Sequence, residues 1–207
     1  MDDPKRIVEQ GYDRIAERHA EWAGRTRAEE RERYARLLFE VLPASARVLE
    51  LGCGVGVPTT RRLAERFRVT AVDLSARHVA LARENVPGAE VVQGDMARLE
   101  LPPASFDAVA AFYSIIHVPR DEHAELFRRI AGWLGPGGVM LAALGTRDVS
   151  AGYEADWLGA PMYWSSHEPR VELRNIEAAG LAVERAEIET AEEDGQPVSF
   201  LWVLARR

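Results

Sequence analysis

The sequence contains a single cysteine, Cys53, so no intramolecular disulfide can form. It also lacks a Cys and His cluster with the spacing of a zinc site, and we therefore expect no metal in the functional site. No apolar run is long enough to span a bilayer, and the polar start of the chain does not resemble a signal peptide. These absences predict a cytoplasmic protein without a membrane partner.

Basic clusters are absent as well. The 33 acidic residues outnumber the 26 Lys and Arg residues, and no basic run is interleaved with aromatic residues. A nucleic-acid surface needs such a basic patch, so we expect no nucleic-acid partner. With 47% hydrophobic and 29% charged residues, the 207-residue chain has the composition of one globular domain. The sequence is consistent with a monomer and with a homodimer.

The most specific pattern is a strand that runs into a glycine-rich turn, Val48–Val57. Gly52, Gly54 and Gly56 have no Cβ, so the backbone can turn sharply and approach a ligand closely. Their G-x-G-x-G spacing differs from the G-x-G-x-x-G spacing of dinucleotide folds. Glu50, at the end of the strand, would repel a phosphate but attract an ammonium group.

Two aspartates follow later apolar runs. Asp73 ends the candidate strand 68–73, which is where a carboxylate grips ribose hydroxyls in such folds. Asp95 follows the apolar pair Val91-Val92. Each aspartate has a simpler alternative role as the N-cap of a helix. Together with the glycine turn, they favour a ligand that carries both a ribose and an amino group.

This constellation resembles the class I S-adenosylmethionine-dependent methyltransferases of the small-molecule type, from about Arg47 to the end of the chain. The resemblance implies that S-adenosylmethionine is the cofactor. It implies that the glycine turn holds the amino-acid part, that Asp73 binds the ribose and that Asp95 binds the adenine amino group. For Tyr12, which would contact the methionine carboxylate, a place in the core is the alternative. The implied cofactor-binding residues are Tyr12, Glu50, Gly52, Cys53, Gly54, Gly56, Asp73, Leu74, Asp95, Met96 and Phe112.

Strands and helices alternate after Arg47, which predicts an α/β fold with a mainly parallel sheet. The resemblance implies a Rossmann-like sheet of seven strands with helices on both faces, closed by an antiparallel C-terminal hairpin at 182–190 and 198–205. We expect a single domain, 1–207. Its parts would be an N-terminal helical cap (1–43), a cofactor-binding core (44–145), a substrate lid segment (146–170) and a C-terminal helix and hairpin (171–207).

Two loops should face the transferred methyl group, because ligands of open α/β sheets bind beyond the carboxyl ends of the strands. The first, 113–120, carries His117, whose imidazole suits a general base; capping a helix or orienting the substrate is the alternative. The second, 145–169, concentrates aromatic residues that must line a pocket or pack against the domain. The expected substrate-binding residues are Tyr113, Tyr153, Trp157, Met162, Tyr163, Trp164 and His167.

Other polar residues receive weaker assignments. Arginines near these loops could hold a carboxylate or phosphate group of the acceptor, with a surface position as the alternative for each. These arginines are Arg120, Arg147 and Arg170. Three further histidines lie in helical patterns and are expected to be solvated, namely His19, His78 and His123.

We therefore expect metal-free methyl transfer to an O, N or S atom of a small molecule, driven by orientation and desolvation. A nucleic-acid or protein substrate is the alternative, but the chain has Ala111-Phe112-Tyr113-Ser114 where enzymes that methylate exocyclic amines carry Asn- or Asp-Pro-Pro-Tyr. A nicotinamide oxidoreductase is disfavoured by the glycine spacing and by Glu50. A non-catalytic protein that only binds the cofactor is the third alternative.

Overall fold

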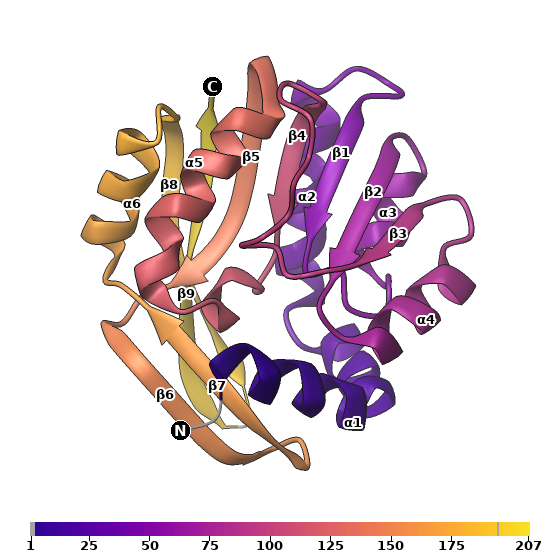
Figure 1. Ribbon diagram of the computed structural model, residues 1–207, viewed down its shortest axis with the longest axis vertical. Helices are drawn as coiled ribbons and strands as arrows, with labels where there is room; N and C mark the ends of the chain where they lie inside the picture. Colours follow the sequence, from indigo (N-terminus) through magenta and orange to yellow (C-terminus); the bar gives the residue numbers. More distant parts are fainter. Residues whose placement is uncertain (1–2, 194) are drawn as a thin grey trace.

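A computed structural model describes residues 3–193 and 195–207. Its main sheet has seven strands in the order β3-β2-β1-β4-β5-β9-β8 (Figure 1). Neighbouring strands from β3 to β5 are parallel, whereas β9 is antiparallel to both β5 and β8. The strands are β1 (Arg47–Leu51), β2 (Arg68–Asp73), β3 (Glu90–Gln93), β4 (Phe106–Ala111), β5 (Leu134–Gly145), β8 (Ala182–Glu193) and β9 (Gln196–Arg206). The predicted fold class is confirmed, including the antiparallel hairpin at the C-terminus.

Helices cover both faces of this sheet, which explains why the residues in the middle of its central strands are mostly apolar. Leu49 and Leu51 of β1 pack with α5 and α6 on one face, whereas Val48 packs with α2, α3 and α4 on the other. Alternate residues of one strand thus enter two separate cores. The helices are α1 (Pro4–Arg25), α2 (Ala28–Val41), α3 (Thr59–Ala64), α4 (Ala76–Asn85), α5 (His123–Trp133) and α6 (Pro169–Ala178).

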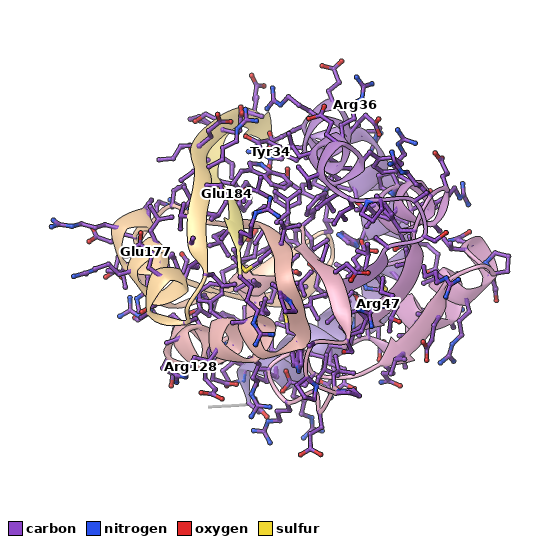
Figure 2. The ribbon with its side chains drawn as sticks, turned by 90° about the horizontal axis from the view of Figure 1, so that it is seen from above. Tyr34, Arg36, Arg47, Arg128, Glu177 and Glu184 are labelled. Carbon is purple, nitrogen blue, oxygen red and sulfur yellow. The ribbon has the colours of Figure 1, made fainter. Side chains whose placement is uncertain are left out.

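Helix α2 is fixed to the C-terminal hairpin by an aromatic stack. Tyr34 lies parallel to Trp202 of β9, with 3.9 Å between ring centroids, and its hydroxyl contacts carboxylates of β8. Figure 2 shows Tyr34 directed toward the hairpin, while Arg36 and Arg128 point outward from their helices. Among the described residues, none of the helices combines the length and the apolar character that crossing a lipid bilayer requires.

The segment expected to be a loop-like lid forms a second, two-stranded sheet of β6 (Val149–Trp157) and β7 (Ala160–Ser166). One side of β7 packs on α1, in an apolar cluster with Val8 and Ile15. In Figure 1, α1 and this hairpin lie beyond the carboxyl ends of β1, β2 and β4. The two elements therefore cover the edge of the sheet at which ligands of α/β folds bind.

The contact between α1 and β7 depends on a glycine. A Cβ atom added to Gly11 would lie 2.6 Å from the Pro161 carbonyl oxygen, so the helix and the hairpin would have to separate. At Gly24, near the end of the same helix, no atom of the described residues lies within 4 Å of the corresponding position.

We expect Gly11→Ala to lower the free energy of unfolding by about 1–3 kcal/mol, because overpacking outweighs the helix propensity of alanine. Gly24→Ala is the matched control and should stabilise the protein by up to about 1 kcal/mol. Urea unfolding of both variants measures the difference. Equal stabilisation by the two substitutions would contradict the close packing of α1 on β7.

Candidate functional site

The glycine turn after β1 adopts backbone conformations that other residues rarely reach. Gly52, Gly54 and Gly56 have φ angles of 79°, 56° and 80°. A Cβ atom on Gly52 would lie only 2.2 Å from Cβ of Ser114, and the Ser114 hydroxyl donates to the Leu51 carbonyl at 2.6 Å. The turn is therefore in direct contact with the loop that follows β4.

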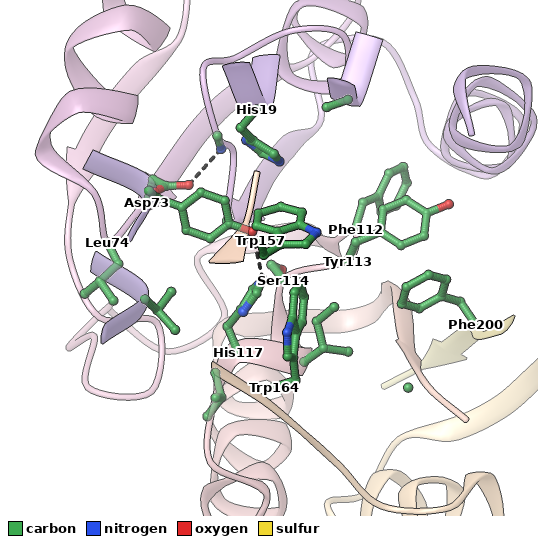
Figure 3. Close-up of a pocket in the computed structure, with 18 of the residues that line it drawn as sticks. His19, Asp73, Leu74, Phe112, Tyr113, Ser114, His117, Trp157, Trp164 and Phe200 are labelled. Carbon is green, nitrogen blue, oxygen red and sulfur yellow. Dashed lines mark hydrogen bonds between the residues drawn. The ribbon is translucent and has the colours of Figure 1, made fainter. Parts of the chain in front are cut away.

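A cavity of about 860 Å³ opens at this contact, within the size range of small-molecule sites. Figure 3 shows His19, Asp73 and Leu74 on one side of it, and Tyr113 and Phe200 on the other. Most of the residues expected in the site line this cavity. They are Tyr12, Glu50, Gly52, Cys53, Gly54, Asp73, Leu74, Asp95, Met96, Phe112, Tyr113, His117, Tyr153, Trp157 and Trp164.

The structure places four expected site residues elsewhere. Gly56 packs against Ala82 and Val86 at the end of α4. Met162 is fully buried in the cluster between β7 and α1, where Gly11 of the helix lies directly over its side chain. Tyr163 packs in the same cluster, and His167 donates from Nε2 to the Arg120 carbonyl outside the cavity.

Asp73 is buried and held by three donors. Its carboxylate accepts hydrogen bonds from the Gly54 amide at 2.7 Å, the Ser75 amide at 3.0 Å and Nδ1 of His78 at 3.2 Å. Burial alone would raise the pKa of Asp73, but the hydrogen bond and charge of His78 and the two amides lower it. Asp73 is therefore a fixed, ionised carboxylate at the end of β2.

Glu50 has the opposite character, although it lies on the neighbouring strand. Its side chain is buried, and burial raises its pKa to about 8. Its Oε2 has no hydrogen-bond partner among the described residues. An unsatisfied buried carboxylate oxygen beside a glycine turn fits a ligand that brings an ammonium group.

Asp95 lies under the first turn of α1. Its Oδ2 is 2.8 Å from Nζ of Lys5, which also reaches Oε2 of Glu122 at 2.5 Å. The other oxygen of Asp95 accepts from the Ala97 amide at 2.9 Å. Lys5 thus links helix α1 to the loop after β3, which forms one end of the cavity.

His117 lies in the cavity as expected, but its pKa is lower than that of the expected general base. Its Nδ1 is 2.8 Å from the Tyr163 carbonyl oxygen, and its Nε2 is 2.8 Å from the Tyr12 hydroxyl. Burial lowers its pKa to about 4, whereas a general base works best when its pKa lies near the working pH. The imidazole is therefore neutral and engaged on both nitrogens.

Three further histidines were expected to be solvated, and the structure corrects this. His78 is buried beside Asp73, and its Nε2 is 3.3 Å from Nδ1 of His19, which lines the cavity. His123 is buried against Glu172, with 2.7 Å between Nδ1 and Oε1. The contacts of His78 with His19 and of His123 with Glu172 join segments far apart in sequence, so helical periodicity gave no signal for them.

Two buried arginines were missed altogether. Arg27 pairs with Glu30 and Glu193. Arg31 lies over the Tyr113 ring at 4.7 Å and donates from one nitrogen to the carbonyls of Ala23 and Thr26. Within the described part of the chain, Arg31 has no carboxylate at ion-pair distance, and it lines the cavity. Its position in a charge-rich helical segment gave no signal of this burial.

A glycine turn, an ionised carboxylate and a second carboxylate thus lie at the carboxyl ends of three adjacent parallel strands, where α/β folds bind their ligands. A family model described as a methyltransferase domain matches residues 48–138. Residues 48–138 therefore carry a methyltransferase domain, in agreement with the resemblance to the class I S-adenosylmethionine-dependent methyltransferases, whose cofactor is S-adenosylmethionine. The orphaned oxygen of Glu50 fits the ammonium group of that cofactor.

Individual relatives and solved structures are similar to this chain over different shares of its length. A trans-aconitate 2-methyltransferase from Paracidovorax citrulli is 41% identical over 118 residues, which cover 54% of this chain and 44% of that protein. A methyltransferase structure from Mesorhizobium loti is 25% identical with a TM-score of 0.66, covering 83% of this chain and 96% of that one. The [4+2]-cyclase SpnF is 18% identical with a TM-score of 0.76, covering 96% and 94%. The match thus spans less than half of the curated relative's length.

Because the pKa of Glu50 is raised by folding, the free energy of unfolding should depend on pH. Between the unperturbed pKa of 4.5 and the folded value of about 8, the native state binds more protons than the unfolded state. The free energy of unfolding contributed by this group therefore falls as the pH rises through that window, by about 1.4 kcal/mol for each pH unit.

We expect Glu50→Gln to remove this loss, so that the variant gains stability over the wild type between pH 5 and pH 8, reaching a few kcal/mol. Urea unfolding at both pH values measures the gain. Glu65→Gln, an exposed carboxylate at the end of α3, is the control and should show no such trend. A pH-independent difference for Glu50→Gln would contradict the buried, protonated carboxyl.

Proposed function

We propose that this protein transfers the methyl group of S-adenosylmethionine to an O, N or S atom of a small molecule. The observation that carries the proposal is the continuity of the cavity. One side is formed by the carboxylates after β1, β2 and β3, and the other by Tyr113, Phe200 and the β6–β7 hairpin. A bound cofactor and an acceptor would therefore meet inside one enclosed space.

The cofactor has a matching group for each of its parts. Asp73 accepts the ribose hydroxyls, and Asp95 with Met96 holds the adenine. Glu50 receives the ammonium group and becomes ionised beside it. Arg31 binds the methionine carboxylate, since it is a buried guanidinium without a carboxylate partner among the described residues, and its charge acts on both Tyr12 and His19.

The acceptor side excludes water and orients the acceptor. S-adenosylmethionine supplies a methyl group that is already activated on a sulfonium, so alignment and desolvation account for most of the rate. Trp157 contacts Trp22 and Trp164 edge-on, at 5.5 Å and 5.2 Å between centroids, and these rings form the wall under α1. Their faces also attract a cationic methyl donor. The expected base, His117, enters the proposal as an orienting group, and the transfer uses no metal.

The acceptor is a small molecule, because the cavity is roofed by α1 and the β6–β7 hairpin. Trans-aconitate, named in the curated relative, is the first acceptor to test. Because a [4+2]-cyclase has a similar fold, the fold alone does not establish methyl transfer, and the decisive assay must measure that reaction directly. Formation of S-adenosylhomocysteine with any small acceptor supports the proposal. Tight cofactor binding without turnover on a broad acceptor panel would instead favour a protein that only binds the cofactor.

We expect Asp73→Asn to weaken binding of S-adenosylhomocysteine by about tenfold to a hundredfold, because charged hydrogen bonds to the ribose are lost. Isothermal calorimetry measures the dissociation constants. Asp107→Asn is the matched control, since Asp107 pairs with Arg47 at the opposite edge of the sheet. Equal affinities for wild type and Asp73→Asn would remove the ribose assignment.

The role of Arg31 has its own test. Arg31→Gln should weaken S-adenosylhomocysteine by about tenfold but leave 5′-methylthioadenosine unchanged, because the latter has no methionine carboxylate. Arg33→Gln, an exposed arginine of the same helix paired with Glu189, is the control. Equal losses for both ligands would show that Arg31 acts on the fold of the cavity, and no loss for either would assign it to the acceptor.

A further inference from the structure

A single imidazole connects three separate segments at the cavity. His117 lies in the short helical turn Ile115–His117 after β4. Its Nδ1 contacts the Tyr163 carbonyl oxygen of β7, and its Nε2 contacts the Tyr12 hydroxyl of α1, each at 2.8 Å. The turn itself is held by the hydrogen bond from the His117 amide to the Ser114 carbonyl at 3.1 Å.

The directions of these hydrogen bonds are fixed by chemistry. A carbonyl oxygen can only accept, so Nδ1 of His117 carries the hydrogen. In the neutral ring Nε2 is then a bare acceptor, and the Tyr12 hydroxyl must donate to it. Hydrogen-bond donation therefore runs from Tyr12 to His117 and from His117 to the backbone of β7. The other neutral tautomer could not keep both contacts.

Tyr12 stands in the middle of the cavity. Its ring centroid lies 4.9 Å from His19, 4.8 Å from His78 and 5.8 Å from Trp157. It therefore lies between the ribose carboxylate side and the hairpin that covers the acceptor side. Figure 3 shows the hydrogen bond that ends at His117 crossing this space.

We infer that His117 is a positioning residue that holds the Tyr12 hydroxyl, so that α1, the loop after β4 and the β6–β7 hairpin close on the cofactor as one unit. Burial keeps the imidazole neutral, as this arrangement requires. The inference rests on the proposed function for its binding and turnover measurements. Its structural core, the tautomer and the bond to Tyr12, can be tested on the protein without any ligand.

A positioning role and a base role predict opposite results for one substitution. A base needs a free Nε2, so Tyr12→Phe would release it and leave turnover intact or higher. A positioning residue acts through Tyr12, so Tyr12→Phe must be as harmful as His117→Ala. The double variant must then be no worse than either single variant, because the two residues contribute one shared interaction.

The experiment measures S-adenosylhomocysteine binding by calorimetry for wild type, Tyr12→Phe, His117→Ala and the double variant. We expect each to weaken binding about fivefold to tenfold, with the double variant equal to the singles. Tyr34→Phe is the control: it removes a buried hydroxyl outside the cavity and should leave binding unchanged. Multiplicative losses in the double variant would overturn the inference.

Nitrogen-15 NMR of the wild-type His117 ring provides one measurement that needs no variant to fold, and the same spectrum of Tyr12→Phe provides a second. We expect the His117 ring to remain the neutral Nδ1–H tautomer from about pH 6 to pH 8, and Tyr12→Phe to shift its Nε2 resonance. Titration of His117 inside that range, together with an acid limb in the turnover of Tyr12→Phe, would make it a base. If the wild type does not bind the cofactor, the proposed function is contradicted, but the NMR result on His117 remains valid.

Discussion

The close approach between the glycine turn and the loop after β4 is the constraint on which the site depends. Only 2.2 Å would separate a Cβ atom on Gly52 from that of Ser114, so any side chain at position 52 pushes the two loops apart. The Ser114 hydroxyl closes the contact through the Leu51 carbonyl. Because Glu50 lies in the strand just before the first loop and His117 lies in the second, the same contact sets how far apart these two groups stand in the cavity.

Two buried carboxylates near this turn differ in ionisation because they differ in donors. Asp73 is buried yet ionised, since His78 and two amides donate to it, whereas Glu50 is buried without such support and its pKa rises to about 8. One oxygen of Glu50 remains unsatisfied. Asp73 is thus ionised without any ligand, whereas Glu50 would lose its proton only when a cationic ligand lies beside it.

Local patterns were sufficient for the core of the fold and for one half of the site. The strand and glycine turn around Gly52, and the aspartates after the next strands, depend on residues adjacent in sequence, so their positions at one sheet edge follow from parallel topology. Arg31 and His78 could not be assigned in this way. Their roles arise where α1 and α2 pack across that edge, through contacts between distant segments. Met162 shows the converse, because aromatic and apolar composition suggested a pocket wall, while the packing of α1 on β7 covers its side chain.

The central claim is that the loops after β1, β2 and β3 form one adenosyl-binding site. A crystal structure with S-adenosylhomocysteine tests it most directly. The account predicts the adenine beside Asp95 and Met96, the ribose on Asp73, and the amino group on Glu50 at the glycine turn. Density for the ligand anywhere else in the cavity, or a ribose that does not touch Asp73, would contradict it.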